Sequence, residues 1–475
     1  MQKMITKIVI QIFTSMVYNK FIMSLQDIED LPEDILPNQE GHIEDTKKMV
    51  RGLKTVKSEL EGRLSEEELS SSYAPIGATG ADTAPLSRYI GLDTPPLHTG
   101  VAMSITSNAP TWGIAGYITP DLPGKFTISG PPLVDDGSGN YWASWNGSNA
   151  GANVVPHEHS FFVQGPQLAG MFYTYGDTDI QIMVDGRLVK PSFTLFPAAA
   201  GSSFVHLDFT DDTSQYKVRE IRVFVGQAGL AQWLVPAGGD IWADTTRRYV
   251  IGIAAADSYF HGAGSTVEGA ISAAALGNQL AIQSGGKCTV ISAGAQGGTG
   301  YINPGTGTTT SPGPNGQTAF GAPNRVAKFA EWASKCDAIV VAGGANDGDA
   351  ATYPVASVVA AAEQAWSDYA AAAPGVPLIV IGIQSGVYPS INAALDTLND
   401  ALKAAALAHP DVTAYVDDRA APTLIYGTGN IGSKTGDGNA DIMVTSDGVH
   451  PTRFGNEYIT RQRISRMGNI PVPAI

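Results

Sequence analysis

The sequence contains little cysteine, and this scarcity excludes two kinds of stabilising site. Cys288 and Cys336 are the only cysteines among 475 residues. Two thiols cannot build a multi-disulfide scaffold or a zinc site made of thiolates. Each cysteine precedes an apolar run. We therefore expect two buried free thiols, with one disulfide between them as the alternative.

Basic residues are also few, since 29 Lys and Arg stand against 45 Asp and Glu, for a formal net charge of −16. Such a chain has no large basic surface for a phosphate backbone, so we expect no nucleic-acid partner. Charged residues make up only 16%, whereas glycine reaches 54 residues. This balance is typical of an extracellular or viral protein, and we expect an extracellular or virion location, with secretion as the alternative.

Long hydrophobic runs are missing as well. The apolar residues 1–22 are interrupted by Lys7, Gln11 and Lys20, and a spanning helix needs about 18 uninterrupted apolar residues. We expect no membrane insertion. The segment is compatible with a signal sequence lacking an evident cleavage site, with a translation artefact before Met23, or with a structured part of the protein.

What is present divides into three regions: an N-terminal segment (1–71), an accessory domain (72–244) and a C-terminal domain (245–475). Residues 43–69 are rich in Glu, Lys and Leu and predict a helix. Its apolar residues follow helical spacing, at Met49, Leu53, Val56, Leu60 and Leu64. The helix is either a single surface helix or a short stalk that associates chains, most simply as a homotrimer.

The second region shows strand patterns. Apolar and polar residues alternate in 204–209 and 219–226, and residues 179–189 carry an Asp-Gly turn between two apolar runs. Many short strands separated by Gly, Pro and Asp, without a convincing helix, predict an antiparallel β-sandwich.

The third region alternates apolar β runs with alanine-rich helical stretches. Such alternation predicts an α/β fold in which a parallel sheet has helices on both faces, a three-layer α/β/α, flavodoxin-like arrangement. The predicted strands are 249–255, 289–294, 337–343, 377–383 and 412–417. Helices are predicted after a capping box at Ser265–Glu268 and at about 324–335, 354–373, 389–408 and 451–467.

Chemically capable residues follow these strands, at the sheet edge where α/β proteins bind ligands. Ser258 follows the first strand, glycines follow the second, and Asn346 follows the third. Asp447 lies three residues before His450, a spacing that lets a carboxylate accept from the imidazole Nδ1–H and leaves Nε2 free as a base. Each motif alone is compatible with an ordinary turn or cap. Their occurrence in order at one sheet edge favours a nucleophilic serine.

The four motifs resemble the blocks of the SGNH (GDSL-type) hydrolase family over about residues 250–460. The matching stretches are "ADS" with Ser258, "GAQGG" with Gly297, "GAND" with Asn346 and "DGVH" with Asp447 and His450. One position departs from the family, because Ala256 stands where the family has glycine.

The resemblance implies acyl transfer without a metal or organic cofactor. Ser258 would attack an ester carbonyl, His450 would accept its proton, and Asp447 would orient the histidine. The oxyanion hole would consist of the Ser258 and Gly297 N–H groups and the Asn346 amide. Gly294 and Gly298 are the alternatives to Gly297 as donor.

The predicted order of domains is similar to that of two-domain carbohydrate esterases, and also to a phage tail protein that carries an enzyme. Both imply a carbohydrate ester substrate, an O-acetyl group above all. The polar loop 301–318 favours such a substrate, and Trp112 and residues 142–147 offer aromatic platforms. The alternatives are a lipase or thioesterase with the same triad, and a non-catalytic adhesin or virion structural protein. Residues 157–159 (His-Glu-His) lack an evident third ligand, so no metal is expected.

Overall fold

The computed structural model describes residues 83–90, 95–112, 114–118, 125, 127–129, 133–135, 141–143, 156–174, 178–196, 201–211, 213–214, 216–262, 273–305, 317–384, 392–419, 443–445 and 449–474. The predicted helix at 43–69, the apolar residues 1–22 and the capping box at Ser265–Glu268 lie outside the described residues. The described residues all belong to one compact unit, residues 73–475.

The C-terminal domain contains the predicted parallel sheet. Its described strands run in the order β17-β16-β18-β19-β20, and all neighbouring pairs are parallel. Their side chains are mostly buried because helices cover both faces. The strands are β16 (Tyr249–Ala256), β17 (Cys288–Ile291), β18 (Ala338–Ala342), β19 (Leu378–Ile381) and β20 (Val412–Val416). The predicted α/β fold is confirmed.

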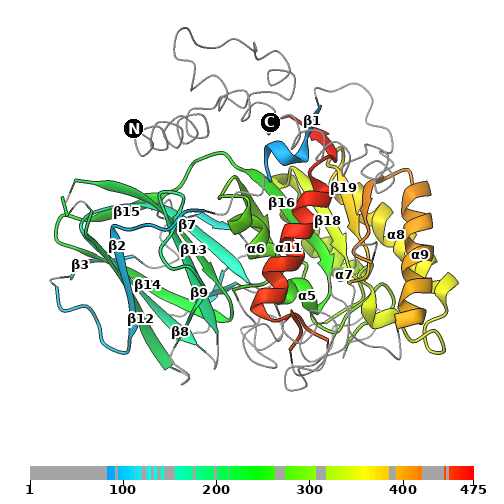
Figure 1. Ribbon diagram of the computed structural model, residues 1–475, viewed down its shortest axis with the longest axis horizontal. Helices are drawn as coiled ribbons and strands as arrows, with labels where there is room; N and C mark the ends of the chain where they lie inside the picture. Colours follow the sequence, from blue (N-terminus) through cyan, green and yellow to red (C-terminus); the bar gives the residue numbers. More distant parts are fainter. Residues whose placement is uncertain are drawn as a thin grey trace, which may run out of the picture. The chain divides into compact units, whose positions relative to one another are not determined.

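Helices pack on the two faces of this sheet through separate apolar clusters (Figure 1). One face carries α5 (Ser258–His261), α6 (Leu276–Gln283) and α11 (Arg453–Met467). The other face carries α7 (Pro323–Ala330), α8 (Val355–Ala372) and α9 (Asn392–Ala408). The helix predicted at 324–335 is shorter than expected, since a 3₁₀ turn, η3 (Ala333–Lys335), follows α7. Within the described residues, no helix combines the length and apolar character needed to cross a membrane.

Cys288 and Cys336 lie in these clusters as buried free thiols, as the sequence predicts. Burial raises the pKa of Cys288 to about 11 and that of Cys336 to about 12. Both thiols therefore stay protonated and act as small apolar side chains.

The accessory domain, called the β-domain below, contains two antiparallel sheets, each of seven strands among the described residues. One has the order β10-β9-β13-β7-β15, with β4 and β11 at its side, and the other the order β2-β12-β8-β14-β6-β5, with β3 at its side. Residues of both sheets share one apolar core around Trp233. The strands are β2 (Val101–Thr106), β3 (Ile114–Ile118), β4 (Thr127–Ser129), β5 (Leu133–Asp135), β6 (Tyr141–Ala143), β7 (His157–Gln164), β8 (Gln167–Thr174), β9 (Asp179–Val184), β10 (Arg187–Leu188), β11 (Thr194–Leu195), β12 (Gly201–Phe209), β13 (Val218–Val225), β14 (Ala228–Pro236) and β15 (Asp240–Ala243).

The Asp-Gly pair between β9 and β10 forms the predicted tight hairpin. Asp185 has φ 49° and Gly186 has φ 73°, and Val184 pairs directly with Arg187. A two-residue turn with positive φ at both positions matches the twist of the flanking strands, which explains why Asp and Gly stand there.

The sequence assigns residues 83–90 to the accessory domain, but in the structure they pack on the C-terminal domain. β1 (Thr83–Pro85) pairs antiparallel with β21 (Pro471–Pro473), which follows α11. The next residues, η1 (Leu86–Arg88), Tyr89 and Ile90, contribute buried side chains to a core cluster of the C-terminal domain. These residues lie there because their apolar side chains are buried beside a strand that is distant in sequence. The pattern of neighbouring residues gives no sign of such a long-range contact.

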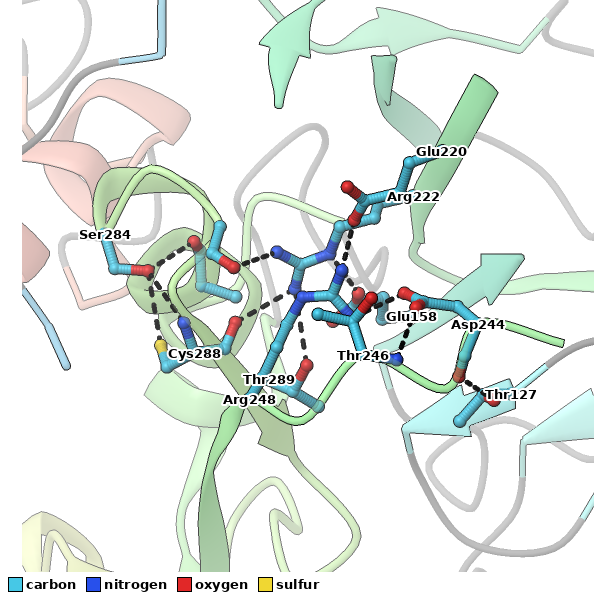
Figure 2. A network of polar contacts seen from close by, with 12 residues as sticks. Thr127, Glu158, Glu220, Arg222, Asp244, Thr246, Arg248, Ser284, Cys288 and Thr289 are labelled. Atoms are coloured by element: carbon cyan, nitrogen blue, oxygen red, sulfur yellow. Dashed lines mark hydrogen bonds and ion pairs between the residues drawn. The ribbon is translucent and has the colours of Figure 1, made fainter. Parts of the chain in front are cut away.

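A buried arginine joins the β-domain to the edge of the parallel sheet (Figure 2). Arg222 of β13 donates to the carbonyl oxygens of Gly286 (2.7 Å) and Cys288 (2.9 Å) beside β17. Its Nε lies 2.5 Å from the Glu158 carboxylate, and both side chains are almost fully buried. Burial opposes the charge of Arg222, but Glu158 raises its pKa. The guanidinium thus satisfies carbonyl oxygens that an edge strand leaves unpaired.

A second contact joins β9 to the start of α11. The buried carboxylate of Asp179 accepts from the Ala273 N–H (2.6 Å) and lies 3.4 Å from Arg453. Arg453 also donates to the carbonyl of Phe193 (3.0 Å). The β-domain therefore contacts the C-terminal domain at two separate places, each with a buried charge.

Replacing Arg222 by Met should lower the free energy of unfolding by about 3–5 kcal/mol, because Glu158 stays buried without its cation. Urea unfolding of the variant checks this. Glu158→Gln in the Arg222→Met background should recover part of the loss.

Arg461→Met is the matched control. Arg461 pairs with Glu457 on the surface, with side chains 42% and 40% exposed, and its loss should cost less than about 0.5 kcal/mol. Equal small losses for Arg222→Met and Arg461→Met would contradict the role of the buried pair.

Candidate active site

Ser258 lies at the carboxyl end of β16, where the chain turns directly into α5. The cap of this helix is Asp257, whose side chain accepts from the Tyr259 N–H (3.1 Å). Ser258 is the first helical residue, so its hydroxyl is not used as the cap. Gly262 ends the helix with φ 80°. The short helix places the serine hydroxyl at the sheet edge, with the residue 7% exposed.

His450 lies against this serine. Its Nε2 is 2.9 Å from Ser258 Oγ, a hydrogen-bond distance. The backbone around it is fixed, because the Thr445 N–H donates to the His450 carbonyl and the Tyr259 hydroxyl donates to the Val449 carbonyl. Asp447 lies outside the described residues, so its role as the carboxylate behind His450 stays a prediction.

The last helix begins later than the sequence predicts. Pro451 forms a β-bridge with Val444 instead of starting the helix, and Thr452 is the cap of α11 through the Gly455 N–H. This bridge and the Thr445 N–H bond to the His450 carbonyl hold the backbone on both sides of His450.

Among the three candidate glycines, Gly297 lies beside the serine. A Cβ placed on Gly297 would be 3.7 Å from Ser258 Cβ, whereas one on Gly294 would collide with the carbonyls of Ile253 and Ala254 in β16. Gly298 has φ 75°, and a Cβ placed on it would have Gln317 Nε2, at 3.6 Å, and not Ser258 as its neighbour. Within the part of the chain that the structure describes, the Gly297 N–H meets no acceptor. The loop of residues 294–299, called the 294–299 loop below, therefore offers one N–H next to Ser258.

Asn346 follows β18 in a 3₁₀ turn, η4 (Ala345–Asp347). Its side-chain Nδ2 donates to the carbonyl of Thr299 (2.9 Å), at the end of the 294–299 loop. The neighbouring Asp347 is buried, and its carboxylate accepts from the backbone N–H groups of Tyr301 (2.6 Å) and Asn303 (2.8 Å). The structure thus brings the third strand end against the loop that follows the second strand.

Arg325 of α7 is not among the site residues predicted from the sequence, but its contacts support the carboxyl edge of the parallel sheet. The buried guanidinium donates to the carbonyls of Ala256 (2.9 Å) and Thr318 (2.8 Å) and to Thr299 Oγ1 (3.1 Å). It also donates to the Gly294 carbonyl. Burial lowers its pKa to about 10, which leaves it charged at neutral pH. An arginine in an amphipathic helix has no sequence signal that separates this use from ordinary surface exposure.

Ala256, the residue that differs from the family glycine, is accommodated in β16. It is fully buried, its N–H donates to the Gly294 carbonyl, and its own carbonyl accepts from the Gln296 N–H. These are ordinary extended-strand contacts, so the extra methyl group leaves the strand end intact.

A cavity of about 490 Å³ lies at the other end of β16. Its lining includes Arg88, Arg222, Tyr249 and Lys287. Tyr249 begins β16 and Ser258 follows its end, nine residues along a strand that rises about 3.3 Å per residue. The cavity is thus roughly 25–30 Å from Ser258 and belongs to the junction with the β-domain, not to the serine site.

Residues 249–462 match the family of GDSL-like lipases and acylhydrolases. This part of the chain is a GDSL-like hydrolase domain. The resemblance to the SGNH (GDSL-type) family is confirmed, and the protein is an ester hydrolase. No curated protein sequence matches the chain significantly.

Solved structures are similar to the chain at low sequence identity. One is an acetyl xylan esterase from the rumen bacterium Butyrivibrio proteoclasticus, with 13% identity, a TM-score of 0.46, and coverage of 74% of this chain and 97% of the esterase. Another is a family two carbohydrate esterase from Clostridium thermocellum in complex with cellohexaose, with 13% identity, a TM-score of 0.44, and coverage of 72% and 98%. A third is a salicylyl-acyltransferase from a tetracycline biosynthetic pathway, with 14% identity, a TM-score of 0.44, and coverage of 74% and 98%.

Asp257, which caps α5 in this GDSL-like domain, has a carboxylate with a raised pKa. Burial raises the pKa of Asp257 to about 6, although Arg463 and His450 favour its charged form. The folded protein therefore binds more protons than the unfolded chain between pH 4 and 6. The Asp257 charge costs stability progressively as pH rises through this window and fully above it.

We expect Asp257→Asn to raise the melting temperature at pH 8 and to have a smaller effect at pH 5. The amide oxygen keeps the cap and carries no charge. Thermal unfolding of both proteins at the two pH values measures the difference.

Asp349→Asn is a control of opposite sign, because hydrogen bonds from Thr352 and Ala351 lower the pKa of Asp349. This variant should gain nothing at pH 8. A gain for Asp257→Asn that is the same at pH 5 and pH 8 would contradict the buried-charge explanation.

Proposed function

We propose that this ester hydrolase removes short acyl groups, acetyl above all, from the hydroxyl groups of a carbohydrate. The observation that carries the reaction type is the 2.9 Å contact between Ser258 Oγ and His450 Nε2 at the carboxyl edge of the parallel sheet. A hydroxyl in this position can be deprotonated as it attacks an ester carbonyl.

The reaction proceeds in two halves. Ser258 Oγ attacks the ester carbonyl while His450 takes the hydroxyl proton, and the resulting imidazolium then protonates the leaving alcohol. Water attacks the acyl-serine in the second half, again with His450 as the base, and releases the carboxylic acid. Asp447 is the residue we assign to orient His450.

The tetrahedral oxyanion is stabilised by donors that are fixed before the reaction. We assign this role to the N–H groups of Ser258 and Gly297 and to Asn346 Nδ2. One Asn346 N–H is used by the Thr299 carbonyl, and the second amide hydrogen is left for the oxyanion.

A small acyl group on a polar carrier is supported by the side chains around the 294–299 loop. Gly297 and Gly298 leave little apolar surface next to Ser258, and the nearby Asn303 and Gln317 are polar. Phe454, four residues after His450, is 68% exposed, and an exposed aromatic ring is suited to stacking on a sugar ring. Among the predicted aromatic platforms, Trp112 is half-buried, and the side chains of residues 142–147 lie outside the described residues.

We also propose that the enzyme acts outside the cytoplasm, as a secreted protein or on a virion such as a phage tail, where the substrate would be a bacterial surface polysaccharide. The net charge of −16 and the high glycine content support this location. Association through residues 43–69 as a homotrimer belongs to the same proposal.

Ser258→Ala should reduce turnover of p-nitrophenyl acetate by at least about 10³-fold with little change in melting temperature. His450→Ala should be about as damaging, and the double variant little worse, because the two residues act as one unit. A fluorophosphonate should label the wild-type peptide that contains Ser258.

Ser292→Ala is the matched control, since Ser292 is a buried serine that follows the neighbouring strand β17. Its activity should equal that of the wild type. A fully active Ser258→Ala protein, together with a wild type that fluorophosphonate does not label, would reject the serine mechanism. A wild type without any ester turnover would favour a non-catalytic adhesin.

Acyl-chain preference tests the substrate. We expect kcat/KM for acetyl esters to exceed that for octanoyl esters, and acetate to be released from acetylated xylan, chitin oligomers or bacterial capsule. Parallel assays on p-nitrophenyl acetate and octanoate, with acetate release from the polymers, measure both. A clear preference for octanoyl esters would instead indicate a lipase or thioesterase.

A further inference from the structure

Two of the assigned oxyanion donors are Gly297 and Asn346. Thr299 contacts the part of the chain that carries each of them. Its hydroxyl donates to the carbonyl of Gln296 (2.8 Å), and its backbone carbonyl accepts from Asn346 Nδ2 (2.9 Å). The residue is fully buried. One threonine thus lies between the 294–299 loop and the Asn346 turn.

The hydroxyl contact determines where the Gly297 N–H points. The Gln296 carbonyl and the Gly297 N–H belong to the same peptide unit, which is planar and trans, so the two groups point in opposite directions. Holding the Gln296 oxygen on the side of Thr299 therefore holds the Gly297 N–H on the opposite side. Two more groups fix the loop, because the Gln296 N–H donates to the Ala256 carbonyl and Gln317 Nε2 donates to the Gly297 carbonyl.

Arg325 determines the direction of the Thr299 hydroxyl hydrogen. Arg325 Nη1 lies 3.1 Å from Thr299 Oγ1, and a guanidinium can only donate hydrogen bonds. Thr299 must therefore accept from Arg325 and donate its single hydrogen to Gln296. The hydrogen bonds run in one direction, from the cation through the hydroxyl to the carbonyl, and each polarises the next.

The carbonyl contact of Thr299 orients the Asn346 side chain. Only the amide nitrogen of Asn346 can donate to a carbonyl oxygen, so the nitrogen faces Thr299 and the amide oxygen points elsewhere. This arrangement directs the second amide hydrogen away from Thr299. Both donors depend on the same residue, one through its side chain and one through its backbone.

We infer that Thr299 is a positioning residue of this esterase, which aligns and polarises the Gly297 N–H through its hydroxyl and orients Asn346 through its carbonyl. The inference rests on the proposed roles of Ser258, Gly297 and Asn346. It concerns the reaction centre, so it holds for any ester that the enzyme hydrolyses.

Thr299→Val tests the hydroxyl, because valine keeps the shape and the backbone carbonyl. With p-nitrophenyl acetate we expect kcat to fall by about 10–100-fold, less than for complete loss of an oxyanion donor, and KM to stay within about twofold. Thr299→Ser should restore most of kcat, and Thr299→Cys, a weak donor, should be intermediate.

Thr318→Val is the matched control. Thr318 is also buried and its carbonyl also accepts from Arg325 (2.8 Å), but its hydroxyl has no hydrogen-bond partner among the described residues. Its kcat should stay within about twofold of the wild type. If Thr299→Val unfolds, the comparison of Thr299→Cys with Thr299→Ser carries the test, and equal kcat values for these two would overturn the inference.

A double-variant cycle separates the two contacts. Thr299→Val leaves the backbone carbonyl in place, so it should lower kcat by the same factor in the wild type and in Asn346→Ala. If the loss vanishes in the Asn346→Ala background, the hydroxyl acts through Asn346 and the inference for Gly297 is wrong. Equal kcat values for Thr299→Val and Thr318→Val, with Ser258→Ala inactive, would overturn the inference alone. An active Ser258→Ala protein would instead reject the proposed mechanism.

Discussion

The sheet edge that carries Ser258 depends on one buried guanidinium. Arg325 donates to carbonyls of β16, of the 294–299 loop and of the segment before α7, and so joins three pieces of chain, of which β16 and the loop are otherwise linked by an isolated β-bridge between Ala256 and Ala295. The register of β16 against β18 shifts between Ile253 and Ala255, so the strand end has irregular hydrogen bonding. A planar cation with five donors can bind three carbonyl oxygens and the Thr299 hydroxyl at once, whereas a lysine has only three donors.

The β-domain contacts the C-terminal domain near His450 and also at the opposite end of the parallel sheet. Asp179 of β9 is buried against Arg453, three residues after His450, and Arg222 of β13 is buried against the chain before β17. The segment that carries His450 is therefore braced by a charged contact with the β-domain, whereas the Arg222 contact lies at the end of the sheet far from Ser258. Because ion pairs of this kind are costly to break without their partner, the two domains form one unit rather than an enzyme with a loosely attached module.

Sequence periodicity predicted the parallel sheet because each strand buries both faces and leaves a nearly continuous apolar run. It also placed Ser258, Asn346 and His450 at one edge, since carboxyl ends of parallel strands share an edge. The choice among Gly294, Gly297 and Gly298 required backbone geometry. Arg222 and Arg325 were missed because a buried arginine and a surface arginine look alike in sequence. The pairing of β1 with β21 was missed because its partners are far apart in sequence, as the 390 residues between Thr83 and Pro473 show.

The β1–β21 pair also determines where the two ends of the folded unit leave it. α11 starts beside His450, and its fifteen residues, at 1.5 Å each, lead about 22 Å away before the chain reaches β21. Thr83 and Pro473 are direct neighbours there, so both ends of the unit emerge together on the side away from Ser258. A pull on the N-terminal side of Thr83 is therefore borne first by a pair of strands that lies about a helix length away from Ser258 and His450.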